Sequence, residues 1–225
     1  EPETKIVLET PTGLVTVYVK WENHMVASIN LENVPAFLYR KDLHIDLAGY
    51  GDVSVDIGYG GNFFVLADVH SLGLTITKDT VNLLRSLSKD ILAAANKVIK
   101  VAHPTNPAIN YLDQVLFCQN VPEEDGGYLA QCIFGDAQAD ISPCGTGTST
   151  RLAQRYFRGL IGLEETFVQK SVCGGAFHAK GLRETTLGGV PAIVPYVSCS
   201  DVHITGFNHL IVEENDKLKN GFVSW

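Results

Sequence analysis

The chain has 225 residues, of which 45% are hydrophobic and 19% charged. This composition predicts a soluble globular protein of one large domain or two small ones. The net charge of −8 and the pI of about 5.3 argue against nucleic acid and anionic membranes as partners. No apolar run approaches the roughly 18 residues that a membrane-spanning helix needs, and no signal-peptide pattern opens the chain.

Short segments of alternating apolar and polar residues, bounded by turn residues, dominate the chain and predict strands. The first two form a hairpin around Pro11, Thr12 and Gly13. An acidic loop at 122–127 joins two of the later segments. In chain order, strands are expected within residues 5–19, 26–31, 43–47, 53–57, 63–67, 115–118, 129–134, 166–171, 176–182, 190–197, 203–207 and 209–212.

Two segments have helical periodicity. Residues 79–101 repeat apolar side chains every 3.6 positions, with Asp79 or Thr80 available as a cap. A second helix is expected over residues 150–160, with Leu152 and Leu160 on one face. Many strands with two substantial helices predict an α+β fold, in which helices pack on a mostly antiparallel sheet.

The stretch GYGGNFF at residues 58–64 places consecutive glycines inside a strand pattern. Such glycines indicate close approach of a ligand or of another backbone segment. A bulge or tight turn explains the same residues equally well, so both interpretations stay open.

The most informative stretch is FGDAQADISPCGTGTSTRLAQRYF at residues 134–157, with Cys144 at its centre. Pro143 fixes φ before the cysteine, Gly145 and Gly147 allow tight turning, and residues 148–150 are suitable N-caps. Cys144 is therefore expected at the mouth of a helix N-terminus, where free N–H groups favour a bound carboxylate or the thiolate itself. A thiol placed there has a lowered pKa and can act as a base or nucleophile.

Two neighbouring features have weaker signals. Asp140 lies four residues before Cys144 and can either bind a cationic amine or cap a turn. The glycine-rich segment is not a nucleotide site, because a P-loop ends in Lys-Ser/Thr and Thr150 stands where the dinucleotide fingerprint needs its third glycine.

The five cysteines form an odd set without a CxxC pair, which predicts reduced thiols in a cytoplasmic protein. Cys144 is the functional candidate, and the other four are interpreted as core residues. The seven histidines lack metal-binding spacing, so no metal is expected. His103 or His178 could partner Cys144 in a Cys-His hydrolase. The other four cysteines are Cys118, Cys132, Cys173 and Cys199.

DISPCGTGTS at residues 140–149 resembles the second-cysteine motif of the proline racemase family, which includes the 4-hydroxyproline epimerases. The resemblance extends over nearly the whole chain in family order. It includes ETPTGLV (9–15), NVPAFLY (33–39), DIGYGGNFF (56–64), HPTNPAIN (103–110), ETFVQKSVCGGAF (165–177) and KNGF (219–222).

The resemblance implies a racemase or epimerase without cofactor, in which two cysteines on opposite faces of a cyclic amino acid invert Cα. One thiolate removes the α-proton while the other thiol delivers a proton from the far side. Carried over by motif, Cys144 is the acid/base on one face. The substrate-binding residues that the resemblance implies are Gly145 and Thr146 for the carboxylate, Asp140 for the ring nitrogen, Phe134 for the pocket wall and, as weaker assignments, Asn62 and Phe63.

One departure from the family concerns the other catalytic cysteine, which lies in a Met-Cys-Gly-His type motif that these 225 residues lack. The chain is therefore expected to be the C-terminal portion of a longer protein. The family has the diaminopimelate-epimerase-like fold of two similar α+β lobes. Residues 1–38, with 205–225 returning to them, would then be an incomplete first lobe, and residues 39–204 the second lobe with Cys144.

The expected ligand is a small amino acid, with proline favoured over 4-hydroxyproline because Phe134 and GGNFF indicate an apolar pocket. The 3-hydroxyproline dehydratases of the family carry Thr at the position of Cys144, which makes that branch a poorer match. No cofactor, nucleic acid or membrane partner is expected, and a homodimer is a possible assembly. The alternatives are a non-catalytic or truncated member that binds an amino acid or partner protein, and the Cys-His hydrolase.

Overall fold

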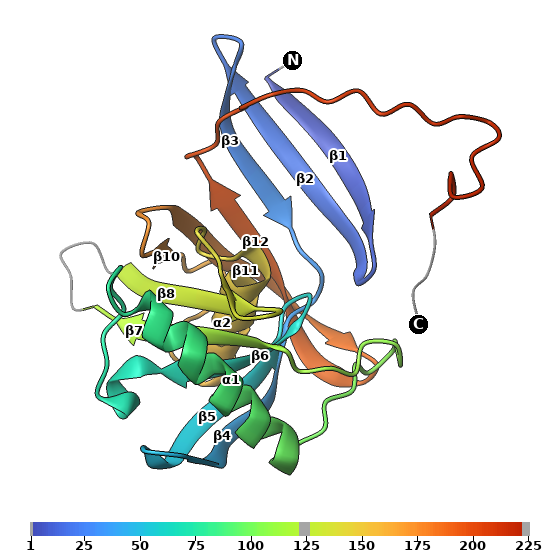
Figure 1. The fold of residues 1–225 in the computed structure, drawn as a ribbon. Helices are drawn as coiled ribbons and strands as arrows, with labels where there is room; N and C mark the ends of the chain where they lie inside the picture. Colours follow the sequence, from blue (N-terminus) through green and yellow to red (C-terminus); the bar gives the residue numbers. More distant parts are fainter. Residues whose placement is uncertain (1, 122–126, 222–225) are drawn as a thin grey trace.

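The computed structural model describes residues 2–121 and 127–221 (Figure 1), so most of the predicted acidic loop at 122–127 lies outside the described residues. The strands are β1 (Glu3–Thr10), β2 (Gly13–Glu22), β3 (Met25–Glu32), β4 (Phe37–Leu47), β5 (Gly51–Tyr59), β6 (Phe63–Asp68), β7 (Gln114–Asn120), β8 (Gly127–Phe134), β9 (Gln138–Ala139), β10 (Phe167–Ser171), β11 (Ala176–Leu187) and β12 (Val190–Cys199). The helices are the short 3₁₀ turn η1 (Val69–Leu72), α1 (Val81–Val98) and α2 (Gly145–Phe157).

The strands form one mixed sheet in the order β1-β2-β3-β12-β11-β10-β8-β7-β6-β5-β4, with β9 paired to β8. The β6–β7 and β8–β10 pairs are parallel, and the other pairs are antiparallel. Just before β4, Ala36 pairs with Ile193 of β12 through two backbone hydrogen bonds of 2.8 and 2.9 Å. The sheet from β12 to β4 therefore curls back onto itself, while β1, β2 and β3 project from it (Figure 1).

The two helices cover opposite faces of the curled sheet because the central strands are apolar on both sides. In β6, Val65 and Ala67 belong to the core under α1, whereas Phe64 and Leu66 face the start of α2. Side chains of successive strand residues point to opposite faces, so an unbroken apolar run buries both. Leu152 of α2 packs in a separate cluster against β10, β11 and β12. Helix α2 therefore contacts strands from both ends of the curled sheet, namely β4, β5, β11 and β12.

The glycine stretch owes its composition to α2. A Cβ added at Gly60 would lie 2.5 Å from the Thr150 nitrogen and 2.6 Å from the Thr146 carbonyl oxygen. A Cβ at Gly58 or Gly61 would lie 2.7 or 2.8 Å from a threonine methyl of the same helix. Both interpretations left open by the sequence are found here, because residues 60–62 are also the tight turn that joins β5 to β6.

Both helices begin at different residues from those predicted. Thr80 is the N-cap of α1, but its side chain makes no cap hydrogen bond and instead donates to the carbonyl of Thr75 at 2.8 Å. Helix α2 begins at Gly145, five residues earlier than expected, and ends at Phe157. Leu160 consequently lies beyond the helix and is exposed, so its predicted place on one helical face with Leu152 is wrong.

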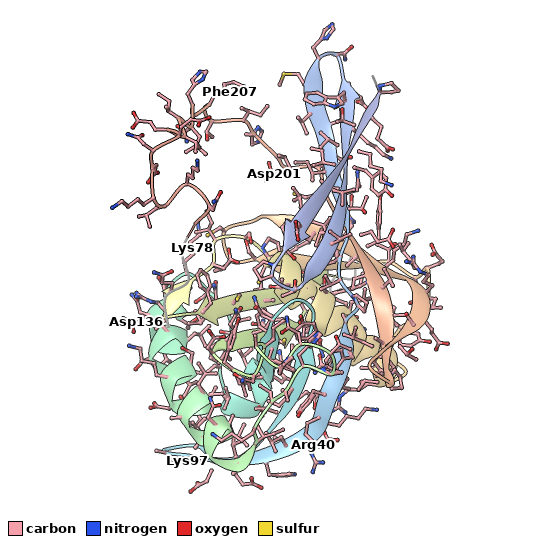
Figure 2. All side chains as sticks on the ribbon, turned by 90° about the vertical axis from the view of Figure 1, so that its right-hand side faces the viewer. Arg40, Lys78, Lys97, Asp136, Asp201 and Phe207 are labelled. Carbon is pink, nitrogen blue, oxygen red and sulfur yellow. The ribbon has the colours of Figure 1, made fainter. Side chains whose placement is uncertain are left out.

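The strands predicted at 203–207 and 209–212 are also wrong. Residues 200–221 follow β12 without forming a strand, and their side chains are largely exposed. Figure 2 shows Phe207 on this segment, away from the body of the sheet. The proposed lobes at 1–38 with 205–225 and at 39–204 stay a prediction. Within the described part of the chain, no helix is both long and apolar enough to cross a membrane.

Candidate active site

Cys144 is the N-cap residue of α2, which corrects the expectation that residues 148–150 cap this helix. Its φ is 67°, a left-handed value that costs free energy in a residue with a side chain. Ser149 and Thr150 lie inside the helix, and their hydroxyls donate to the carbonyls of Gly145 and Thr146 at 3.0 and 2.8 Å.

The backbone before the thiol is fixed from a neighbouring strand. Gln169 of β10 is fully buried, and its Nε2 donates to the carbonyl of Pro143 and to Oγ1 of Thr148, each at 2.8 Å. The Cys144 N–H donates to Oγ of Ser142 at 3.0 Å. The Cys144 carbonyl accepts the Thr148 N–H at 2.8 Å. These bonds determine the direction of the Cys144 side chain.

Cys144 is buried, with only 7% of its surface exposed, but its sulfur still lies beside hydrogen-bonding groups. It accepts the Gly147 N–H at 3.3 Å and lies 3.6 Å from Oγ1 of Thr146. The neighbouring Cys132 thiol, whose sulfur lies within 4.8 Å, is the largest influence lowering its pKa, with Thr146 and Gly147 adding to it. Burial and the charge of Asp140 act in the opposite direction, and the net pKa is below that of an ordinary thiol. The predicted low pKa is therefore found here, but its main cause is Cys132 rather than the helix N-terminus.

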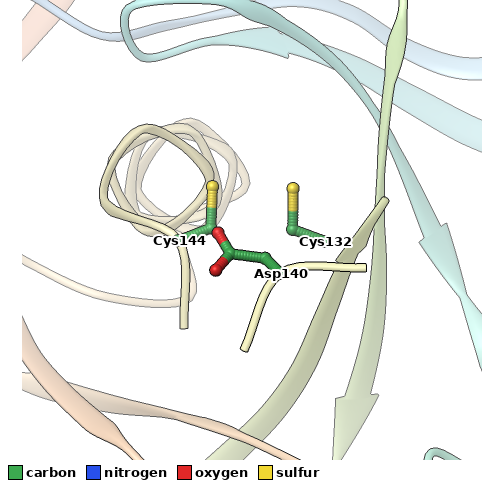
Figure 3. A group of neighbouring side chains, drawn as sticks. All are labelled: Cys132, Asp140 and Cys144. Atoms are coloured by element: carbon green, nitrogen blue, oxygen red, sulfur yellow. The ribbon is translucent and has the colours of Figure 1, made fainter. Parts of the chain in front are cut away.

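Cys132 of β8 is the neighbour that sequence reasoning did not identify. The sulfurs of Cys132 and Cys144 and a carboxylate oxygen of Asp140 lie within 4.8 Å of one another (Figure 3). Cys132 is 1% exposed, so its interpretation as a core residue is correct but incomplete. The neighbouring Cys144 sulfur and its own burial raise its pKa. The available signal was its spacing of two from Phe134, which puts both side chains on one face of a strand.

The other predicted site residues between 134 and 146 lie on the elements around Cys144. Phe134 packs against the apolar cluster that contains both thiols. Gly145 and Thr146 are the first two residues of α2, where N–H groups have no acceptor within the helix. Asp140 accepts the Ser142 N–H at 2.8 Å, so its carboxylate does cap a turn. Its contact with a ring nitrogen stays a prediction.

The remaining candidates lie elsewhere in the fold. Phe63 is fully buried in an aromatic cluster on the α1 face, 5.0 Å from the Tyr59 ring centroid, and Asn62 is half-buried in the turn before it. Their contact with substrate stays a prediction. His103 packs beside Tyr59 in the same cluster, and His178 is exposed on β11. Among the described residues, neither histidine is a hydrogen-bond partner of Cys144, which disfavours the Cys-His hydrolase.

The side chains of Cys132, Asp140 and Cys144 are also the group that could hold a metal ion. Two sulfurs and a carboxylate oxygen are donors that soft cations accept. Cys144 and Asp140, however, already accept backbone N–H groups, and Cys132 lies in an apolar environment. The expectation of no metal stays a prediction.

Comparison with known proteins connects this site to a family. The model of the family described as proline racemase matches residues 1–223. The chain belongs to the proline racemase family. Over 223 residues it is 37% identical to a trans-3-hydroxy-L-proline dehydratase of Burkholderia cenocepacia (strain HI2424) and 37% identical to a proline racemase of Acetoanaerobium sticklandii. Each alignment covers 99% of this chain and 66% of the relative.

A solved structure of a family member has the same fold. The probable proline racemase from Agrobacterium radiobacter K84, with bound carbonate, matches at a TM-score of 0.87 and 32% identity. The match covers 100% of this chain and 65% of that one. The predicted α+β fold of the diaminopimelate-epimerase-like type is confirmed, and the resemblance to the proline racemase family with it. The chain spans slightly under two thirds of the length of the curated relatives.

Proposed function

We propose that Cys144 is an acid/base thiol that exchanges the α-proton of proline, or of 4-hydroxyproline, in a cofactor-independent racemase or epimerase. The observation that carries this proposal is the position of its sulfur. It lies at the N-cap of α2, accepts the Gly147 N–H and has a lowered pKa. A thiolate available near neutral pH can take a proton from carbon, provided the substrate is oriented toward it.

The neighbouring groups suit the charges of an amino acid. In the proposed complex, the free N–H groups of Gly145 and Thr146 hold the carboxylate and disperse the charge that develops there when the α-proton leaves. Asp140 receives the cationic ring nitrogen, and Phe134 contacts the ring. The substrate cation would also offset the repulsion between the Asp140 carboxylate and the Cys144 thiolate, which otherwise raises the pKa of Cys144.

Inversion needs a second acid/base on the other face of Cα, and Cys132 cannot fill this role. Reacting atoms approach to about 3–3.5 Å, so thiols on opposite faces of one carbon lie roughly 6–7 Å apart. The sulfurs of Cys132 and Cys144 lie within 4.8 Å of each other, which leaves no room for a ring between them. We propose that the opposing thiol comes from the Met-Cys-Gly-His type motif that the family resemblance implies.

The alternative is a non-catalytic family member that binds a small amino acid or a partner protein. Proton exchange separates the two. The protein is incubated in D₂O with L-proline, D-proline or 4-hydroxyproline, and the Cα–H signal is followed by NMR. Loss of the signal with inversion supports the racemase or epimerase and identifies its substrate. Binding without exchange, in a chain that contains both cysteine motifs, overturns the proposal in favour of the alternative.

A pair of variants ties the exchange to Cys144. General acid/base groups contribute about 10²–10⁴-fold to rates, so Cys144→Ala should slow exchange at least about 100-fold. Cys173→Ala is the matched control because Cys173 is an exposed thiol, which also shows that its interpretation as a core residue is wrong. Equal exchange in the Cys144→Ala variant and the parent would refute the assignment of Cys144.

A further inference from the structure

Cys132 has no role in the mechanism proposed above, yet the strand pattern directs it at Cys144. In β8, Ala130 and Cys132 face the start of α2, whereas Ile133 faces α1. The two thiols therefore approach from different elements, one from the strand and one from the helix N-terminus (Figure 3). A buried polar group usually has a partner, and the Cys144 sulfur, which lies within 4.8 Å, is placed to be that of the Cys132 thiol.

We infer that Cys132 is a positioning residue for Cys144: its S–H donates to the Cys144 sulfur, and the pair keeps one proton, held on Cys132. The inference rests on the proposed function, because it explains how the base is kept ionised. Removing the Cys132 donor should leave the Cys144 thiol protonated over a wider pH range.

The surroundings decide which of the two sulfurs keeps the proton. The Gly147 N–H and the N-terminus of α2 point at Cys144, and both stabilise negative charge there. Cys132 lies in a strand among apolar side chains such as Phe64 and Leu116. Desolvation disfavours the charged form of a group in such an environment. The Cys132 thiol is therefore the donor and the Cys144 thiolate the acceptor.

The charged groups around the pair do not change which sulfur keeps the proton. Asp140 disfavours the charge on Cys144, but it and the half-buried Asp113 also disfavour a charge on Cys132. Arg151 of α2 interacts instead with Cys118 of β7. Strand β6 presents the apolar side chains Phe64 and Leu66 to this cluster, and the charge of Asp68 on the same face acts on Cys118. The main favourable contacts to the thiolate thus come from its own helix and from Cys132.

The test measures alkylation of each cysteine by iodoacetamide from pH 5 to pH 10, under reductant and without amino acid. Peptide mass spectrometry resolves Cys144 from the other thiols. In Cys132→Val, the rate at Cys144 should fall about tenfold at pH 7. This is the low end for a hydrogen bond to a charged group, because S–H is a weak donor. The difference should close at high pH, where the thiol of either protein is ionised.

Two further variants make the result specific. Cys132→Ser keeps a donor and should stay within about threefold of the parent. Cys118→Val is the matched control, because Cys118 is buried in the same cluster but donates to the carbonyl of Leu116 at 3.4 Å. Its Cys144 profile should be unchanged. Should Cys132→Val fail to fold, Cys132→Ala supplies the donor-free profile.

An unchanged pH profile in the donor-free variant would overturn the inference. So would a rate reduced equally at every pH, which indicates altered access, or an equal shift in Cys118→Val, which indicates general loosening of the cluster. Because no amino acid is present, the profile is independent of racemisation. A shifted profile with no proton exchange would contradict the proposed function alone, and exchange with an unshifted profile would contradict the role of Cys132 alone.

Discussion

A methyl group added at Gly60 should displace the start of α2 and, with it, Cys144. The new Cβ would lie 2.5 Å from the Thr150 nitrogen and 2.6 Å from the Thr146 carbonyl oxygen. Both contacts are roughly 1 Å closer than ordinary van der Waals contacts. Both atoms belong to the helix backbone, so no side-chain rotation can relieve the overlap. The loop before β6 and the first turn of α2 must therefore move apart.

The expected cost follows from this overlap. Overpacking costs about 1–3 kcal/mol, so Gly60→Ala should lower the free energy of unfolding in urea by that amount. Misplacing a catalytic group by about 1 Å can cost about 100-fold in rate, and α-proton exchange should fall to that extent. Gly162→Ala is the matched control, because the added Cβ would lie 3.7 Å from an oxygen of Glu165, an ordinary van der Waals distance. That control should stay within about 0.5 kcal/mol of the parent.

The reasoning fails if Gly60→Ala unfolds at the urea concentration of the parent and exchanges the α-proton at the same rate. The helix would then tolerate a backbone shift of this size, and close packing against the glycine stretch would not place Cys144. A normal rate with reduced stability would refute only the link between helix position and activity.

Two further substitutions test the supports of α2. Asp56→Asn should lower the free energy of unfolding at pH 7 by about 1–3 kcal/mol, because Asp56 accepts hydrogen bonds from Arg158 in a buried position. Burial acts to raise the pKa of Asp56, but these hydrogen bonds lower it overall. Its stabilisation is thus complete above the unfolded pKa of about 4 and is lost as the pH falls through the folded value, so urea unfolding should show the two proteins converging in acid. Gln169→Ala should cost about 1–3 kcal/mol in the same assay and slow exchange, whereas the exposed Gln138→Ala should change neither.

The start of α2 shows where local sequence patterns fail. Gly145 and Gly147 resemble turn residues, and isolated glycines inside a helix cost about 1 kcal/mol relative to alanine. Gly147 is nevertheless helical, and a Cβ there would lie 3.1 Å from both the Cys144 sulfur and a methyl of Leu116. Its small size serves packing between α2 and β7 rather than a turn. Tertiary contacts decide this boundary, and no short-range pattern contains them.

The C-terminal residues 203–212 and the contact between Cys132 and Cys144 differ from the prediction for related reasons. Residues 203–212 alternate like a strand, but alternation supplies no neighbouring strand, and a strand needs one for its hydrogen bonds. Cys144, Asp140 and Phe134 lie within eleven residues, so the sequence predicted their proximity. The contact between Cys132 and Cys144 depends on how β8 meets α2, a relation between two elements that only the folded chain defines.

The left-handed backbone of Cys144 connects these observations. Such a conformation costs of order 1–3 kcal/mol and persists only where the surroundings determine it several times over. Here Gln169 fixes the preceding carbonyl, Ser142 and Thr148 fix the N–H and carbonyl of Cys144, and Gly147 fixes its sulfur. A return of φ to negative values would turn the sulfur away from the helix N-terminus and from Cys132 at once. The φ angle of Cys144 therefore controls both of the contacts that favour the thiolate, which explains why the strain lies at this residue.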